Sequence, residues 1–479
     1  MKNIILSLFV LAAGLVCSCS DLLVEKPQSI AVESFYNTNS EIEAGVAAIY
    51  APLRSGDIFG VIYTLVLESS SDFFEGRASW ATLSLYQGLD NTNQSRTGNA
   101  WRQLYSAVRN ANIMIEAIPK AKSVSDNDKD KYLGETRFLR ALAYFQLVRN
   151  WGAIALRTEE NKFEYNLPRT PVAEVYQLIV SDLEFAEAAL PSTATITGHP
   201  TKWSAKTLLA DVYFYLNQYS KAAEKSNEVI QSRQYSLVEV TVPDDFEKLY
   251  GASVVNSTEE IFYFKYHTQD MWLFPVYIHG FEIPHIIFPG GGFLAIYNNE
   301  NYPVYVNWDD DDLRKTYNWY PFEFSAVAKG MLLLKKFNDR ESTSPRNSYP
   351  LYRYADCLLM YAEASCHVSG GPTAAGLEAL NMVHRRAYGY PATQPSPVDF
   401  RLSDYNKESF IDLCMKERGY ETVGEGKRWL DLKRAGKAMA EKIVRENKGR
   451  EIAEKHYLWP IPVSETNYND AITDQNPGY

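Results

Sequence analysis

The sequence predicts a mainly helical protein in which tetratricopeptide-like helix pairs form a scaffold, joined to a loop-rich region with a few short strands. Three observations support this prediction. Long segments in both halves of the chain repeat apolar residues at helical spacing. One segment has the small–aromatic–alanine spacing of a tetratricopeptide pair. The middle of the chain, from Tyr235 to Asp339, has little helical periodicity.

The chain begins with a targeting segment. Met1–Asn3 is a short basic start, and Ile4–Val16 is an apolar run shorter than the ~20 residues that span a bilayer. Ser18 and Cys19 follow this run. This order predicts a bacterial lipoprotein signal peptide over residues 1–18 and diacylation of Cys19, which would anchor the protein to a membrane. An ordinary secretory signal is the alternative.

The next segments have strong helical patterns. Trp101–Ile118 and Lys131–Trp151 carry apolar stripes, and Gly152 is a stop signal for the second helix. Thr170–Pro171 has the composition of a helix start, with proline at the first helical position, and that helix is expected to end at Pro191. These segments predict neighbouring helices that bury their apolar faces on one another.

A helix pair follows, with helices predicted over 203–216 and 219–232. Four of its residues have tetratricopeptide spacing: Leu209, Ala210, Tyr213 and Ala222. Small residues at such positions let paired helices approach closely. Several pairs in a row favour a solenoid, because each pair must bury its face on a neighbour.

The second half combines strands, long loops and a return to helices. Residues 259–267 and 330–337 are typical of strands. Helices are predicted over 353–368, 373–388, 405–420 and 427–440. Aromatic residues are abundant in the long loops between the strands, which argues against disorder there. The tail, with Trp459, three prolines and a final Tyr479, is predicted to lie against the folded body.

Composition excludes some classes of partner and structure. The chain has 48 basic and 59 acidic residues, a balance that argues against nucleic-acid binding. It has 33 Tyr, 22 Phe and 9 Trp, and such rings suit binding surfaces as well as cores. Beyond the signal region there are three cysteines, which argues against a disulfide framework. They are predicted to be small core residues: Cys357, Cys366 and Cys414.

Four stretches together resemble the RagB/SusD family of nutrient-uptake outer-membrane lipoproteins. They are ETRFLRALAYFQLVRNWGAIAL (135–156), LYRYADCLLMYAEA (351–364), KERGYETVGEGKRWLDLKRAG (416–436) and LWPIPVSETNYNDAITDQNPGY (458–479). The second and third stretches hold charged residues that we expect to be partly buried and to join the helices: Arg353, Asp356, Glu363, Glu417, Arg418, Arg428 and Asp431.

The resemblance implies one SusD-like unit over residues 19–479. Its helical scaffold would comprise about 35–232 and 351–440, its ligand-binding insertion about 235–350, and its closing segment 441–479. Such lipoproteins sit on the outer face of the outer membrane and pass oligosaccharides to a cognate TonB-dependent, SusC-like transporter. Peptides replace oligosaccharides in the RagB branch, so a peptide ligand is the alternative.

Sugar binding needs flat rings for the apolar face of a sugar and planar polar groups for its hydroxyls. Two regions offer both kinds of group. The stretch 69–86 supplies Asp72, Arg77 and Trp80, and the middle region supplies Trp272, Tyr297 and Trp319. For each of these rings the alternative is a place in the core or at the transporter interface. Trp80 is the strongest candidate, because polar residues flank it and no helical stripe includes it.

Catalysis is the weaker hypothesis. A glycoside hydrolase needs two carboxylates across a cleft. Asp309–Asp312 are consecutive, so their side chains diverge, and such a run is more typical of a solvated turn or a helix cap. His279 and His285 lack partners at metal-ligand spacing. We therefore expect no catalytic residue, no metal and no cofactor; a pure protein-interaction scaffold is a further alternative.

Overall fold

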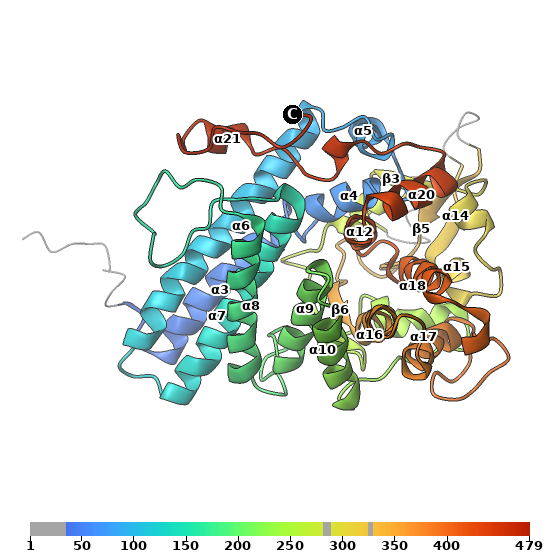
Figure 1. The fold of residues 1–479 in the computed structure, drawn as a ribbon, viewed down its shortest axis with the longest axis horizontal. Coiled ribbons are helices and arrows are strands. Elements are labelled where there is room, and N and C mark those ends of the chain that lie inside the picture. The colour runs from blue at the N-terminus through green and yellow to red at the C-terminus, as the bar shows by residue number, and fades with distance from the viewer. Residues whose placement is uncertain (1–34, 281–288, 324–328) are drawn as a thin grey trace, which may run out of the picture.

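Helices make up most of the chain that the computed structural model describes, namely residues 35–280, 289–323 and 329–479. Figure 1 shows long helices side by side at one end of the molecule, with strands and long loops gathered at the other. The prediction of a mainly helical protein with few short strands is confirmed. Cys19 lies outside the described residues, so its lipidation stays a prediction.

The helices at one end are α3 (Asn39–Arg54), α6 (Asn91–Ala117), α7 (Asp126–Trp151) and α8 (Val172–Ala189). They pack in succession, α3 on α6, α6 on α7 and α7 on α8. Ser125 caps α7 by accepting the Asp128 N–H, so this helix begins before the predicted Lys131. Helix α6 also begins early, because Asp90 caps a polar first turn that carries no apolar stripe.

The predicted helix pair is α9 (Lys202–Tyr215) and α10 (Tyr219–Gln231), and α10 packs on both α9 and α16. The following helices are α16 (Tyr354–Ser369), α17 (Ala374–Ala387) and α18 (Lys407–Thr422). The single helix predicted over 427–440 is wrong. Two helices, α19 (Arg428–Arg434) and α20 (Lys437–Lys448), occupy this region. Gly436 has φ +93°, which interrupts the helical backbone between them.

Shorter helices connect these elements. They are α4 (Ile62–Ser69), α5 (Ala81–Ser84), α11 (Glu247–Tyr250), α12 (Phe274–Ile278), α14 (Pro303–Val306), α15 (Leu313–Asn318) and α21 (Val463–Thr466). None of the described helices is both long enough and apolar enough to pass through a bilayer. The cysteines predicted for the core, Cys357, Cys366 and Cys414, are buried free thiols.

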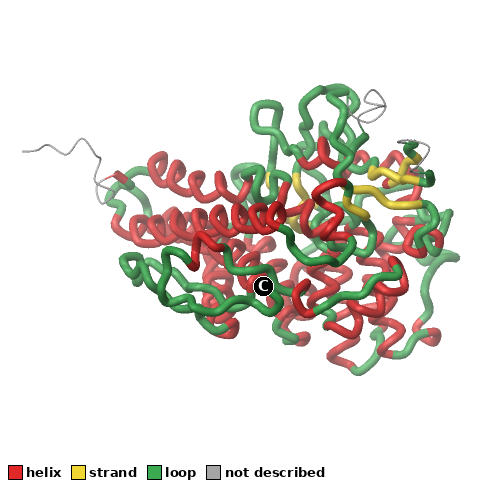
Figure 2. Tube along the Cα trace, turned by 90° about the horizontal axis from the view of Figure 1, so that it is seen from above, coloured by secondary structure: helices red, strands yellow, loops and turns green. Residues whose placement is uncertain are grey.

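Two small antiparallel sheets organise the loop-rich end, where Figure 2 shows the strands. One sheet has the order β1 (Glu75–Gly76), β3 (Ile296–Asn299), β5 (Met331–Leu334) and β4 (Trp319–Pro321). The other pairs β2 (Glu260–Phe264) with β6 (Tyr349–Arg353). Because β1 belongs to the first half of the chain, its pairing with β3 brings the stretch after Gly76 to the middle region.

The tail is pinned to the helical body, as the sequence predicts. The Trp459 backbone N–H donates to the Asn150 carbonyl at 2.7 Å, and the Trp151 indole donates to the Pro460 carbonyl at 3.1 Å. The two indole rings meet edge to face, with centroids 4.9 Å apart. Asn476 closes the contact by donating to the Trp151 carbonyl at 2.9 Å. The tail therefore covers the end of α7.

Candidate functional site

The loop after α4 is held in place by a buried ion pair between Asp72 and Arg428. Asp72 is fully buried, and Arg428 donates to both of its oxygens at 2.6 and 2.9 Å. Burial opposes ionisation of this carboxyl, but Arg428 outweighs it and lowers the pKa of Asp72. Asn447 adds a hydrogen bond to Asp72 at 2.7 Å. Predicted as a ligand residue, Asp72 has the contacts of a residue that positions the loop.

Lys448 holds the same loop from α20. Its ammonium donates to the carbonyls of Phe74 at 2.6 Å, Ser71 at 3.2 Å and Ser84 at 3.3 Å. Burial lowers the pKa of Lys448 to about 8. One side chain thus satisfies three carbonyls along the loop and fixes its path.

We expect Lys448→Met to loosen residues 70–86 without unfolding the protein. The variant removes three hydrogen bonds, and each buried carbonyl left without a partner costs about 1–3 kcal/mol. Hydrogen exchange followed by mass spectrometry should show at least tenfold faster exchange in this loop. Lys442→Met is the matched control, because Lys442 lies on the same helix and pairs with Asp412 at the exposed surface. Equal loop exchange in the two variants would contradict the anchoring role.

Beyond Gly76 the chain turns toward the middle region. The Arg77 N–H donates to the Ala295 carbonyl at 2.8 Å, extending the pairing of β1 with β3. The Arg77 guanidinium donates to the carbonyls of Leu294 and Phe293, each at 2.9 Å. Gly76 is required at this turn, because a Cβ there would collide with the Trp80 carbonyl. Arg77 therefore joins the early loop to residues 293–295.

Trp80 lies next to this junction but is largely covered. It is 5% exposed, and the Arg96 guanidinium lies 3.5 Å above its ring. Arg96 is held there by the carbonyl and hydroxyl of Ser79, at 3.2 and 2.8 Å, and by the Asn93 amide oxygen at 2.7 Å. The Arg96 guanidinium thus covers one face of the Trp80 indole, so that face is not free for a ligand.

Two further rings, outside the set predicted from the sequence, lie on the segments that Arg77 contacts or that pair with them. Tyr277 and Phe293 have centroids 5.0 Å apart at an interplanar angle of 62°, and Phe293 is 57% exposed. Backbone hydrogen bonds at 2.7 Å, from Phe293 to Val276 and from Ala295 to Tyr277, fix the two segments together. We call Arg77, Trp80, Arg96, Tyr277 and Phe293 the aromatic surface.

Of the remaining predicted rings, two are buried and the third, Tyr297, is half-buried. Trp272 is fully buried, and its indole donates to the Phe59 carbonyl at 2.9 Å. Trp319, on β4, is buried with its ring centroid 5.4 Å from that of Phe74. Tyr297 is half-buried on β3, opposite Glu75 of β1. The structure thus brings Arg77 and Trp80 together and places Trp272 and Trp319 in the core.

In the acidic segment Asp309–Asp312, Asp312 caps a helix, which is one of the two roles that the sequence favoured. Asp312 caps α15 by accepting the Arg314 N–H at 3.0 Å, and it also pairs with the Arg314 guanidinium. The Trp308 indole donates to Asp312 at 2.8 Å. Its neighbours Asp309–Asp311 are exposed. A carboxylate committed to these structural contacts is a poor catalytic acid or base, so the run does not supply the pair a hydrolase needs.

Comparison with known proteins places this geometry in context. Residues 22–214 match the protein family described as "Starch-binding associating with outer membrane", and residues 285–479 match the one described as "SusD family". The chain is similar to SusD-like protein P38 of Formosa agariphila, with 28% identity over 500 residues that cover 96% of each chain.

Solved structures share the fold. A SusD homolog from Bacteroides thetaiotaomicron aligns with a TM-score of 0.78 over 94% of this chain and 98% of that one, at 20% identity. Surface glycan-binding protein A from Bacteroides uniformis aligns with a TM-score of 0.76 over 92% and 99%, at 22% identity. At these identities the likeness shows the fold, and it confirms the SusD-like fold that the sequence resemblance implied.

Proposed function

The chain belongs to the SusD/RagB family, and on that premise we propose that it is a glycan-binding lipoprotein of the outer face of the outer membrane. In this proposal it captures oligosaccharides at the aromatic surface and delivers them to a cognate SusC-like, TonB-dependent transporter. Diacylated Cys19 would tether it to the membrane. The protein binds its ligand and does not cleave it.

The aromatic surface is the observation that carries the proposal. Tyr277 and Phe293 offer a ring pair to solvent, and Arg77 fixes the backbone that carries Phe293. Rings of this kind can cover the apolar face of a sugar, while the Arg96 guanidinium can donate to its hydroxyls. Tyr297, half-buried on β3, is retained as a candidate ligand residue. Asp72 positions the loop that carries Arg77 and Trp80, and Trp272 and Trp319 lie in the core.

The comparisons supply independent support for a glycan ligand. One matching family description names starch binding and the outer membrane, and one of the structural neighbours is named as a glycan-binding protein. None of the relatives reported above is described as an enzyme, in keeping with the expectation of binding without catalysis. A peptide ligand, as in the RagB branch, remains the second candidate because rings and guanidinium groups also suit peptides.

We expect the double variant Tyr277→Ala/Phe293→Ala to bind glycan at least tenfold more weakly than the unaltered protein. The variant removes the two rings that would cover the apolar face of the sugar, and a tenfold change in affinity corresponds to about 1.4 kcal/mol. Retardation of the protein in native gels that contain starch, laminarin or other soluble polysaccharides would identify a polysaccharide that it binds, which then serves as the probe. Calorimetry with that probe would then give the affinity.

Phe163→Ala is the matched control, because Phe163 is 77% exposed on a loop outside the aromatic surface. It should leave the affinity unchanged. Release of shorter products from the bound probe would favour a hydrolase and count against the proposal. Binding of a glycan-free peptide pool, with no retardation by any polysaccharide, would favour the peptide ligand.

A further inference from the structure

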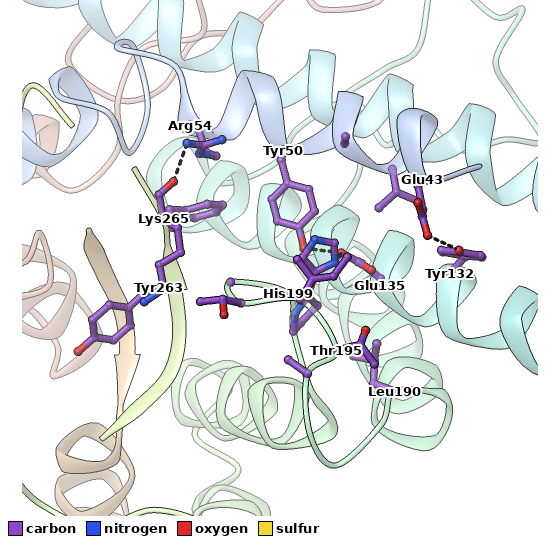
Figure 3. Close-up of a pocket in the computed structure, with 18 of the residues that line it drawn as sticks. Glu43, Tyr50, Arg54, Tyr132, Glu135, Leu190, Thr195, His199, Tyr263 and Lys265 are labelled. Carbon is purple, nitrogen blue, oxygen red and sulfur yellow. Dashed lines mark hydrogen bonds and ion pairs between the residues drawn. The ribbon is translucent and has the colours of Figure 1, made fainter. Parts of the chain in front are cut away.

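A cavity on the helical scaffold contains no residue of the aromatic surface. It has a volume of about 740 Å³ and lies between α3, α7, the segment Leu190–Pro200 and the end of β2 (Figure 3). Sites for small molecules typically measure ~300–1,000 Å³. The cavity is therefore large enough for a ligand of its own.

Helical periodicity explains why two helices line this cavity with polar and aromatic groups. On α3, Glu43, Tyr50 and Arg54 follow one another at spacings of seven and four residues, so they share one face. On α7, Tyr132 and Glu135 are three residues apart and also share a face. Figure 3 shows the Tyr50 ring directed from α3 toward Glu135 on α7.

The segment Leu190–Pro200 forms the third wall. Its ends are tied together by the Lys202 N–H, which donates to the Pro191 carbonyl at 3.0 Å. Gly198 has φ +88°, and a Cβ there would lie 2.9 Å from Cγ of Lys265. Glycine thus permits the close approach of this segment to Lys265. As a result His199 lies beside Tyr50 at the centre of the cavity, with ring centroids 5.6 Å apart.

The charges of the cavity are unevenly compensated. Two of its cations are already paired with its own acids: Arg54 with Asp270 at 2.5 Å, and Lys131 with Asp128 at 3.1 Å. Lys265 pairs with Glu260 at 2.5 Å. Within the described ranges, neither Glu43 nor Glu135 has a lysine or arginine partner. Two carboxylates of the cavity are thus left without a permanent cation.

Tyrosine hydroxyls hold these two carboxylates in place. Tyr132 donates to Glu43 at 2.9 Å, and Tyr50 donates to Glu135 at 2.5 Å. His199 Nδ1 also lies 2.8 Å from Glu135. Each carboxylate therefore stands beside an aromatic ring. Carboxylates form charge-assisted hydrogen bonds with ammonium groups, and tyrosine rings attract cations, so this combination is suited to an ammonium group.

We propose that the cavity binds a small molecule through its ammonium group, with Glu43 and Glu135 as the anionic partners and Tyr50 and Tyr132 as the ring partners. Lysine-containing peptides and amino sugars both carry this group. The cavity is separate from the aromatic surface, so the protein would have two ligand sites. Failure of this proposal would leave the glycan site untouched, and the reverse also holds.

Calorimetry on the full chain, purified in detergent, tests the proposal with two pairs of probes. Trilysine is compared with its side-chain-acetylated form, and the glucosamine trimer with the N-acetylglucosamine trimer. We expect at least one charged probe to bind at least tenfold more tightly than its acetylated partner. Preference for trilysine would indicate a peptide source, and preference for the glucosamine trimer an amino-sugar source. Equal binding within both pairs, or no binding of any probe, would overturn the proposal.

Variants locate the site. Glu135→Gln and Glu43→Gln should each weaken binding of the charged probe at least fivefold. Glu43 is exposed, so Glu43→Gln tests the site even if the Glu135 variant does not fold. Asp126→Asn is the control, because Asp126 is an exposed acid on α7 outside the cavity. An effect of Asp126→Asn equal to that of Glu43→Gln would show attraction by the general surface charge and refute the site.

The pH dependence of trilysine binding tests whether His199 competes with the ligand, because a residue with a purely structural role would not change it. Burial opposes protonation of His199, but Glu135 outweighs it and raises the pKa of His199. Protonated His199 competes with the ligand for Glu135, so trilysine should bind more weakly at pH 5.5 than at pH 8. The other charged groups at the cavity are Glu43, Arg54, Asp128, Lys131, Lys265 and Asp270. His199→Gln should abolish this difference; a difference that persists would contradict the competition.

Discussion

Replacing Arg353 by methionine is expected to lower the free energy of unfolding by about 3–5 kcal/mol, because it leaves buried carboxylates without their cation. Arg353 is fully buried at the start of α16. Its guanidinium donates to Glu425 at 2.7 and 3.2 Å and to Glu421 at 2.8 Å. Burial opposes ionisation of both glutamates, but Arg353 and neighbouring cations hold their pKa values below the ordinary value. Urea unfolding at pH 7 measures the loss.

Arg445→Met is the matched control for this experiment. Arg445 forms an ion pair with Glu451 at 2.9 Å, but the two side chains are 59% and 72% exposed. Solvent screens such a pair, so its removal should leave the free energy of unfolding nearly unchanged. Similar losses of unfolding free energy in the two variants would contradict the prediction, because the buried Arg353 pairs would then stabilise the fold no more than an exposed pair does.

This network shows how far the sequence could predict the interior. Charged residues in the stretches 351–364 and 416–436 were expected to be partly buried, and the structure buries Arg353, Glu417 and Asp431 further than that. Glu425 was not singled out, although it joins Arg353, Lys336 and Lys427. Its pairing depends on the loop between α18 and α19, and no local pattern specifies how such a loop folds back.

The helices were predictable because their signals are local. The apolar stripe of 131–151 and the spacing around Tyr213 reflect contacts that repeat every turn, so they can be read from one segment. The break at Gly436 was missed because the apolar pattern continues across it, while the backbone does not. Gly436 has φ +93°, a conformation that glycine adopts easily and that ends one helix before the next begins.

The aromatic surface was only partly predictable. Arg77 and Trp80 were selected because polar residues and a ring in a loop are typical of a binding site. The cover over Trp80 comes from Arg96 on α6, a contact that only the tertiary structure reveals. Tyr277 and Phe293 lie in a stretch rich in aromatic residues, and nothing in their spacing separates exposed rings from buried ones such as Trp272. Tertiary packing makes that separation.

Replacing Glu68 by glutamine is expected to make the protein more stable at neutral pH, by about 3 kcal/mol at pH 7. Glu68 is buried on α4 and accepts the Gly426 N–H at 2.5 Å, while its other oxygen has no hydrogen-bond partner among the described residues. Burial raises its pKa to about 8, although the Gly426 N–H and Lys336 oppose this shift. The folded protein thus keeps this carboxyl protonated at pH 7.

The sign of the effect follows from proton binding. The unfolded chain loses the Glu68 proton near pH 4.5, and the folded protein loses it near pH 8. Between these values the folded state holds one more proton, so stability falls by about 1.4 kcal/mol per pH unit as the pH rises. Glutamine has a similar shape, supplies an acceptor for Gly426 and has no such proton to lose. The two proteins should therefore be nearly equal in stability at pH 4.5 and diverge as the pH rises.

Urea unfolding of both proteins from pH 4.5 to 8 measures this divergence, and taking the difference removes the contributions of every other titrating group. Glu224→Gln is the control, because Glu224 is exposed on α10 and should give a difference near zero at every pH. A Glu68→Gln difference that stays constant with pH would mean that the folded protein carries Glu68 ionised. The buried oxygen would then need a cation or water beside it, and α4 would pack on the loop at Gly426 through a charge rather than through a neutral hydrogen bond.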